Sequence, residues 1–433
     1  MSFLEVSVHG NAITERDVQT GTNRETIRRI RARWVFSAAR APVAEGVVSI
    51  RGGRILEVAQ RADERGVEDL GNVAILPGFV NAHTHLEFSS LAEPLGEPGI
   101  RLPEWIRALM AWRNSEAGLR AENTIQGLEE SVCLGTTTLG EIAQTGWPQA
   151  AFESVAVGAM VFLELIAPRP ENLEMAMEQA RRHLQHSHSR WRRGLSPHAP
   201  YTVRGELLDY AIALSSVHRV PLAFHLAESR EELELLRSGT GPLADFLREL
   251  ESWDPGVVAP PARPLDYLRR LAAADRVLVV HGNYLDDDEI ELLAENCDRM
   301  AVVYCPRTHG HFGHPCYPLP RMLAAGVSVA LGTDSRASSP DLSMLAEMRA
   351  VARKHPSVDP RTVLELATLR GARSLGLDRE VGSLEPGKCA DLAMVALPDR
   401  GAKDPYELLF DSDLPVVATW CRGEPVYQAP AQV

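Results

Sequence analysis

The chain has 433 residues, of which 45% are hydrophobic and 24% are charged. These values are typical of a folded globular protein and exclude a disordered or collagen-like chain. With 45 basic and 58 acidic side chains, the formal net charge is −13. This charge argues against nucleic acid as a partner, because binding to a phosphate backbone needs a basic surface.

Several features of the sequence indicate where in the cell the protein resides and how it assembles. The six cysteines are scattered and form no CxxC pair, which argues against a disulfide scaffold or a zinc ribbon. No apolar run reaches the roughly 18 residues of a membrane span, and the first residues lack the pattern of a secretory signal. We therefore expect a cytoplasmic protein with no membrane partner. A homodimer is the expectation for its assembly, since dimers are the commonest oligomers.

The two ends of the chain share one pattern. Residues 1 to about 26 are polar and weakly patterned, which indicates a loosely ordered arm. From Ile30 onward, short β-branched runs alternate with turn residues and predict hairpins, and the pattern returns near the C-terminus. We expect a small composite β-sandwich built from residues 1–74 and 381–433, on either side of a larger domain over residues 75–380.

In the middle of the chain, short unbroken apolar runs alternate with amphipathic stretches. The apolar runs cover 159–166, 220–228, 276–283, 300–306 and 327–335, and the amphipathic stretches cover 171–185, 229–238, 286–297 and 318–326. Unbroken apolar strands are typical of a parallel sheet that is buried on both faces. This α/β pattern predicts a (β/α)8 TIM barrel or a doubly wound sheet.

Polar residues follow the apolar runs at regular places. His83 and His85 are two residues apart, so on a strand their side chains point to the same side and can coordinate one metal ion. His225, His281 and Asp334 each end a later apolar run. A single such histidine is more often an ordinary core residue, but a barrel would bring all these ends to one mouth. Three imidazoles and a carboxylate suit Zn²⁺ or Fe²⁺.

Glu228 lies three residues after His225, just past the same apolar run. Hydrolysis at a metal needs a base that takes a proton from water and an acid that protonates the leaving group. A carboxylate beside the metal serves both purposes. The alternative is that Glu228 only begins the next helix, where acidic residues are common.

Five motifs in order carry a clear resemblance: PGFVNAHTHLEF, SPHAPYT, FHLAES, VHGNYL and LGTDSRASSPDLSML. Over nearly its whole length the chain resembles the amidohydrolase superfamily. Within it, the similarity is to the branch of cytosine deaminase-like proteins, chlorohydrolases and S-adenosylhomocysteine deaminases. The resemblance implies a barrel with one bound metal ion.

The resemblance also implies roles for particular residues. The metal ligands would be His83, His85, His225 and Asp334. Glu228 would carry the proton, His281 would polarise the substrate or orient the hydroxide, and Asp334 would also bond the attacking water. His198, in SPHAPYT, matches a position that touches substrate. The implied reaction is hydrolytic deamination of an amino-substituted N-heteroaromatic ring.

The lysine content bears on the number of metal ions. Superfamily members with two metals bridge them through a carboxylated lysine on a mid-barrel strand. The first lysine of this chain is Lys354, in a predicted helix after the strand of Asp334. The sequence therefore excludes a lysine-bridged pair and favours a single divalent ion.

The substrate is less closely defined. Some members with the HTHLEFS text act on aminodeoxyfutalosine, and here Glu87 is the acidic residue beside the metal pair. Trp105 is a candidate to stack on an aromatic ring, and Arg336 a candidate to bind an anionic group. The alternatives are a peripheral glutamate, a helix-packing tryptophan and an arginine paired with a carboxylate such as Asp341. Glu141 and Glu164 also end apolar runs and are candidates to line the mouth.

One segment departs from the resemblance. Relatives carry Ser-Asn after Cys-Pro-Arg, whereas this chain has Thr308 and then His309, His311 and His314. These histidines indicate a reshaped substrate loop or, alternatively, a second metal site. The alternative functions are a chlorohydrolase or amidohydrolase acting on an s-triazine or cyclic amide, and a non-catalytic relative that has lost its metal.

Overall fold

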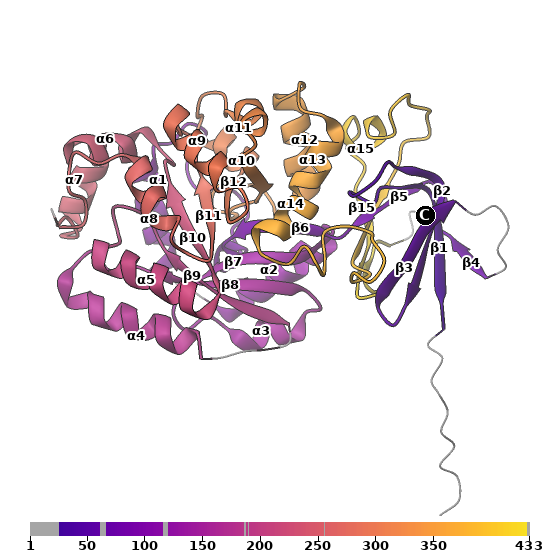
Figure 1. The fold of residues 1–433 in the computed structure, drawn as a ribbon, viewed down its shortest axis with the longest axis horizontal. Helices are drawn as coiled ribbons and strands as arrows, with labels where there is room; N and C mark the ends of the chain where they lie inside the picture. The colour runs from indigo at the N-terminus through magenta and orange to yellow at the C-terminus, as the bar shows by residue number, and fades with distance from the viewer. Residues whose placement is uncertain are drawn as a thin grey trace, which may run out of the picture.

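A computed structural model describes residues 26–60, 66–115, 120–185, 188, 190–254 and 256–430. The expected N-terminal arm lies almost wholly outside these residues. The chain forms two parts, a barrel surrounded by helices and a smaller β domain beside it (Figure 1). Within the described part, none of the helices has the length and apolar character needed to cross a bilayer.

The barrel consists of eight parallel strands that follow one another in chain order. They are β6 (Phe79–Thr84), β7 (Thr136–Ala143), β8 (Gly158–Leu165), β9 (Trp191–Pro197), β10 (Pro221–Leu226), β11 (Arg276–His281), β12 (Met300–Tyr304) and β13 (Ser328–Leu331). Just beyond β13, the Asp334 amide donates to the carbonyl of His83 at 3.1 Å, and Thr84 pairs with Asp334 as a parallel bridge. The last strand thus returns to the first, which confirms the (β/α)8 TIM barrel and excludes the doubly wound sheet.

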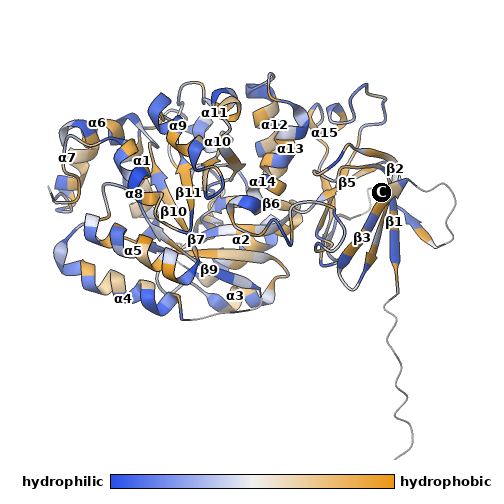
Figure 2. Cartoon of the chain, viewed as in Figure 1, coloured by the Kyte–Doolittle hydropathy of each residue, from blue (hydrophilic) through white to orange (hydrophobic). Residues whose placement is uncertain are grey.

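Helices fill the connections between these strands, and α12, α13 and α14 follow the last of them. They are η1 (Leu86–Phe88), α1 (Leu102–Arg113), α2 (Ala121–Cys133), α3 (Gln149–Ser154), η2 (Pro170–Asn172), α4 (Leu173–His183), α5 (Gly205–His218), α6 (Arg230–Ser238), α7 (Pro242–Glu249), α8 (Pro264–Leu271), α9 (Asp287–Glu295), α10 (Pro306–His311), α11 (Leu319–Ala325), α12 (Met344–Lys354), α13 (Pro360–Leu366) and α14 (Leu369–Ser374). Their blue faces turn outward while the strands are largely orange (Figure 2). The helices therefore cover the outer face of the barrel.

The barrel strands are apolar along their length because both of their faces are buried. Phe162, Leu278 and Val280 point into the barrel and pack with Ala372 and Leu375, from α14 and its C-terminal end. The alternate residues of the same strands pack outward against the helices. Burying each such side chain contributes about 1.5–3 kcal/mol. This two-sided burial explains why the sequence shows unbroken runs rather than strand-like alternation.

The second part is one eight-stranded sheet with the order β16-β15-β14-β5-β1-β2-β3, and β4 pairs with β1. Its strands are β1 (Arg28–Val35), β2 (Val43–Arg51), β3 (Arg54–Gln60), β4 (Val67–Asp69), β5 (Val73–Pro77), β14 (Leu392–Ala396), β15 (Val416–Cys421) and β16 (Glu424–Gln428), and α15 (Glu407–Phe410) lies between β14 and β15. The pairing of β5 with β14 joins the two ends of the chain. This confirms that the β domain is a composite of both termini.

The barrel interior provides a test of the fold. Leu278→Ala removes a fully buried side chain from it. We expect the free energy of unfolding to fall by about 2–5 kcal/mol, because a cavity remains where the side chain was. Urea denaturation followed by circular dichroism measures this. The matched control is Val217→Ala at a site with 75% exposure, where we expect a change within about 0.5 kcal/mol. Equal changes in both variants would contradict the assigned core.

Candidate metal centre and active site

The carboxyl ends of the barrel strands carry the polar residues that the sequence singled out. His83 lies in β6 and His85 directly follows that strand, while His225 lies in β10 and His281 ends β11. Asp334 follows β13. His281 and Asp334 have positive φ angles of 69° and 57°. Non-glycine residues adopt this conformation rarely, and it occurs preferentially at functional sites.

The structure brings these residues together into one buried cluster. The ligand atoms of His83, His85 and His225 lie within 4.8 Å of one another, and so do those of His83, His281 and Asp334. The Oδ1 atom of Asp334 is 3.7 Å from Nε2 of His83 and 3.9 Å from Nε2 of His85. Its other oxygen, Oδ2, accepts a hydrogen bond from the Ser338 hydroxyl at 3.0 Å. One carboxylate oxygen is therefore free to face the imidazoles.

The hydrogen bonds of the imidazoles fit a metal centre. Nδ1 of His225 is 3.1 Å from the carbonyl oxygen of His198. Because a carbonyl only accepts, Nδ1 carries the proton and Nε2 keeps its lone pair, as metal-ligating histidines require. The buried Nε2 of His83 and Nδ1 of His85 find no hydrogen-bond partner among the described residues. Buried polar atoms without a partner are costly, and a bound cation would satisfy Nε2 of His83.

The electrostatics of the cluster favour neutral imidazoles at His85 and His225 and an ionised carboxylate at Asp334. Burial and the neighbouring His83 lower the pKa of His85 to about 4. Burial and the neighbouring histidines also hold the pKa of His225 well below its ordinary value. Burial alone would raise the pKa of Asp334, but His83, His281 and His85 together lower it below its usual range. Neutral imidazoles and a carboxylate are the protonation states that bind Zn²⁺ or Fe²⁺.

Glu228 lies beside this cluster, two residues past the end of β10. Its Oε1 atom is 3.4 Å from Nε2 of His281. Burial, together with the nearby Asp334 and Glu232, raises the pKa of Glu228 well above its ordinary value. A carboxyl group with a raised pKa can both accept and return a proton near neutral pH.

Two groups outside the cluster hold its backbone. The hydroxyl of Tyr317 donates to the carbonyl of His281 at 2.8 Å, and its ring stacks on Tyr304. Both carboxylate oxygens of Glu141, in β7, accept from the amide of Leu86 at 3.1 Å. Leu86 follows His85 directly, so Glu141 fixes the segment that carries one of the expected ligands. Glu141 is one of the residues that the sequence suggests for the mouth, whereas no pattern in the sequence points to Tyr317.

A cavity of about 290 Å³ opens onto the cluster. His85, His225, His281, Glu228 and Asp334 form its floor. Its apolar wall comes from α1 and from the region of α7, and the contributing residues are Leu102, Trp105, Ile106, Leu109, Met110, Phe246, Leu247 and Leu250. A mostly apolar cavity with a few convergent polar groups is typical of a small-molecule site.

Further polar residues line the same cavity. His198, Glu164 and Arg113 all face it. Burial alone would raise the pKa of Glu164, but His198, His85 and Arg113 lower it below its ordinary value. Nε2 of His198 is 4.0 Å from Oε1 of Glu164. His198 and Glu164 are among the residues that the sequence indicates for this site. Arg113 is not, because it lies at the end of α1 in a stretch without a recognisable motif.

The remaining candidates for substrate binding lie in different places. Trp105 lines the cavity from α1, and its indole Nε1 donates to the carbonyl of Ala337 at 2.9 Å. Glu87 is hydrogen-bonded to Arg113 and faces a neighbouring cavity. Arg336 donates to the carbonyls of Leu91 and Ala92 and pairs with Glu130 at 2.8 Å. Of these three side chains, only that of Trp105 lines the cavity of the cluster.

The side chains of two of the three histidines after β12 have separate partners, and the buried Nε2 of the third, His309, has none among the described residues. Nε2 of His311 is 3.1 Å from the carbonyl of Leu95, and Nδ1 of His314 is 2.9 Å from the hydroxyl of Tyr284. The possible metal-binding groups found among the described residues do not include His309, His311 or His314. The geometry therefore gives no support to a second metal site in this loop.

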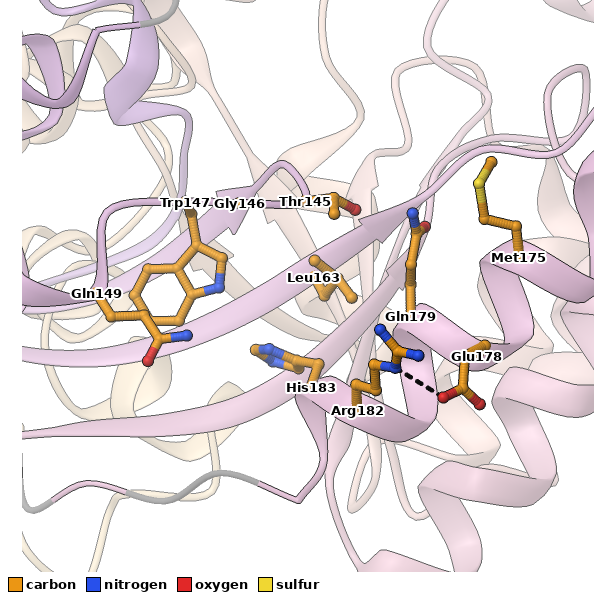
Figure 3. Close-up of a pocket in the computed structure, with 10 residues that line it drawn as sticks. All are labelled: Thr145, Gly146, Trp147, Gln149, Leu163, Met175, Glu178, Gln179, Arg182 and His183. Carbon is orange, nitrogen blue, oxygen red and sulfur yellow. Dashed lines mark hydrogen bonds and ion pairs between the residues drawn. The ribbon is translucent and has the colours of Figure 1, made fainter.

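A larger cavity of about 460 Å³ lies outside the barrel (Figure 3). Its lining comes from the segment after β7, from Leu163 and from α4, where Arg182 pairs with Glu178. His183 also lines it, with Nε2 3.1 Å from the carbonyl of Val161. The described residues around this cavity include none of the expected metal ligands. The smaller cavity over the cluster is therefore the candidate active site.

Comparison with known proteins defines the class of this chain. The pattern of the amidohydrolase family matches residues 74–426. The chain therefore belongs to the amidohydrolase family, and it is a hydrolase that acts on carbon–nitrogen bonds.

Individual relatives match most of the chain. It is 32% identical over 361 residues to aminodeoxyfutalosine deaminase of Deinococcus radiodurans. This match covers 76% of this chain and 81% of that protein. It is 32% identical over 378 residues to 5-methylthioadenosine/S-adenosylhomocysteine deaminase of Syntrophobacter fumaroxidans, covering 81% and 80%. The crystal structure of an adenosine deaminase from Xanthomonas campestris with bound zinc superposes with a TM-score of 0.77 at 26% identity, covering 92% of both chains.

The cluster predicts how the protein responds to loss of a ligand. His83→Ala removes an imidazole whose Nε2 atom is buried without a partner. We expect this variant to retain less than a tenth of the zinc that the wild-type chain binds, because a four-ligand site loses one donor. Zinc per chain after dialysis, measured by mass spectrometry, tests this.

The matched control is His311→Ala, which removes a histidine of the loop after β12. It should bind zinc as the wild-type chain does. Chelation should lower the melting temperature of the wild-type chain and of His311→Ala, because an ion that binds only the folded state stabilises it. Full zinc binding by His83→Ala would contradict the assignment of the centre.

Proposed function

We propose that this protein is a metal-dependent aminohydrolase that removes an amino group from an N-heteroaromatic ring. Its candidate substrates are adenine nucleoside derivatives, and aminodeoxyfutalosine is the first to test. The observation that carries the proposal is the contact of 3.4 Å between Glu228 and His281 beside the cluster of histidines and Asp334. The named activities of the two relatives support the substrate class.

One divalent ion, Zn²⁺ or Fe²⁺, would be held by His83, His85, His225 and Asp334. When bound, such an ion lowers the pKa of a water ligand to about 7 and so supplies a nucleophile at neutral pH. The side chains of the chain provide the remaining steps. The Oδ1 atom of Asp334 lies 3.7 Å and 3.9 Å from Nε2 of His83 and His85, and it would accept a hydrogen bond from the attacking water.

Glu228 would move the proton. Its carboxylate takes one proton from the attacking water as the new carbon–oxygen bond forms. It then gives this proton to the amino group, and the carbon–nitrogen bond breaks with release of ammonia. His281, which contacts Glu228 through Nε2, would polarise the ring at the carbon under attack.

The cavity wall would select the substrate. The aromatic and aliphatic side chains of α1 and the α7 region provide apolar contact for a ring and its substituent. Trp105 would pack against the substrate, and His198 would bind a polar atom of it. A substrate packed against this wall would displace water from the cavity, which strengthens the electrostatic contacts of Glu228 and Asp334.

The direct test is ammonia release by metal-quantified protein. The panel contains aminodeoxyfutalosine, adenosine, 5-methylthioadenosine, S-adenosylhomocysteine, cytosine, guanine and a chloro-triazine. We expect ammonia from at least one adenine nucleoside with about one metal ion per chain. Release of chloride from the triazine with no ammonia from any nucleoside would contradict the proposal.

A substitution separates proton transfer from metal binding. Glu228→Gln keeps the size of the side chain but cannot accept a proton, so we expect kcat to fall about 10²–10⁴-fold. Zinc content should stay at the wild-type level, because Glu228 is not among the expected ligands. The control is Glu231→Gln, in the first turn of α6 and outside the residues that line the cavity, which should keep the wild-type kcat. A fully active Glu228→Gln protein would contradict the role of Glu228.

A further inference from the structure

The short segment that carries Glu228 is held on both sides of its backbone. The carbonyl of Leu226 accepts from the amide of Gly282 at 3.0 Å, and that of Ala227 from the amide of Tyr284 at 3.2 Å. The carbonyl of Glu228 accepts from the side-chain amide of Asn283 at 2.9 Å. The loop after β11 therefore holds all three carbonyls.

The amides on the other side of this segment are held by one buried carboxylate. Oε1 of Glu232 accepts from the amide of Ala227 at 3.0 Å, and Oε2 accepts from the amide of Glu228 at 2.7 Å. Glu232 lies in the first turn of α6 and is only 1% exposed. Ala227 has a φ angle of 53°, which is unfavourable for alanine and persists only when the surroundings impose it.

The arrangement departs from an ordinary helix start. Ser229 precedes α6 and its hydroxyl accepts from the amide of Glu232 at 3.1 Å. In a capping box, the glutamate would return a bond to the amide of Ser229 itself. Here the carboxylate of Glu232 reaches past Ser229 to the two preceding amides. Helix capping alone does not account for that reach, whereas fixing Glu228 does.

A neighbouring helix supplies the comparison. Glu289 occupies the same position in the first turn of α9 and is also 1% exposed. It forms the ordinary box, in which its carboxylate accepts from the amide of Asp286 at 2.8 Å and the Asp286 carboxylate accepts from its amide. Its second bond goes to the amide of Leu265 at 3.2 Å. Glu289 thus resembles Glu232 in burial and bonding but holds no segment of the active site.

We infer that Glu232 and Asn283 are positioning residues that fix the backbone of Glu228 and so keep its carboxylate against His281. The inference rests on the proposed function, in which Glu228 carries the proton. A carboxylate is required at position 232 because both of its oxygens must accept. In Glu232→Gln the side-chain NH₂ would face a backbone N–H, so one of the two hydrogen bonds is lost. The backbone segment that carries Glu228 would then shift. Removing the Asn283 amide frees the carbonyl of Glu228 in the same way.

The test compares Glu232→Gln, Asn283→Ala and the matched control Glu289→Gln in the full-length, zinc-loaded chain. For Glu232→Gln we expect kcat to fall about 10–100-fold, because small displacements of a reacting group and loss of its supporting bonds have effects of this size. KM should stay within about twofold and zinc content should not change. Asn283→Ala should show the same pattern with a smaller loss, and Glu289→Gln should keep the wild-type kcat.

Crystal structures of the zinc-loaded variants give a readout that does not depend on activity. We expect the Glu228 carboxylate to move away from Nε2 of His281 in Glu232→Gln and to stay in place in Glu289→Gln. An unmoved Glu228, or equal loss of kcat in Glu232→Gln and Glu289→Gln, would overturn the inference. If Glu232→Gln does not fold, a wild-type kcat for Asn283→Ala would overturn it. If the wild-type chain releases no ammonia, the proposed function fails, and the position of Glu228 alone decides the inference.

Discussion

The hydrogen bond from the amide of Asp334 to the carbonyl of His83 joins the last barrel strand to the first at 3.1 Å. The candidate centre depends on this closure, because His83 and Asp334 are far apart in the sequence. In an open sheet they would lie at opposite edges, and no ion could reach both. A closed parallel barrel brings all strand ends to one mouth, so residues scattered along the chain share one buried site.

The buried groups at this mouth illustrate how the fold accommodates polar chemistry in an apolar core. Burying a polar or charged group is costly unless it is bonded. Asp334 is bonded by Ser338, and Glu141 accepts from the amide of Leu86. The Nε2 atom of His83 lacks a partner among the described residues. The fold thus provides hydrogen-bond partners for the supporting carboxylates. It leaves the Nε2 atom of His83, a potential metal ligand, without one where an ion would bind.

The sequence predicted the composite β domain and the cluster, because each depends on a local pattern or on residues at strand ends. The pattern alone left a barrel and a doubly wound sheet open, and the family resemblance favoured the barrel. His83, His85, His225 and Asp334 follow apolar runs, and the fold class converts that position into proximity. The ion pair of Arg336 could not be predicted, because its partner Glu130 lies far away in the sequence. Glu232 and Tyr317 act through the backbone of their neighbours. Such contacts depend on loop conformation, which periodicity does not encode.

The most direct test of the metal centre is the anomalous diffraction of crystals of the zinc-loaded protein at the zinc absorption edge. We expect one peak per chain, at about 2.0–2.2 Å from the imidazoles of His83, His85 and His225 and from a carboxylate oxygen of Asp334. A principal peak elsewhere, for example between His309 and His314, would contradict it. So would a fully occupied peak that Asp334 does not contact.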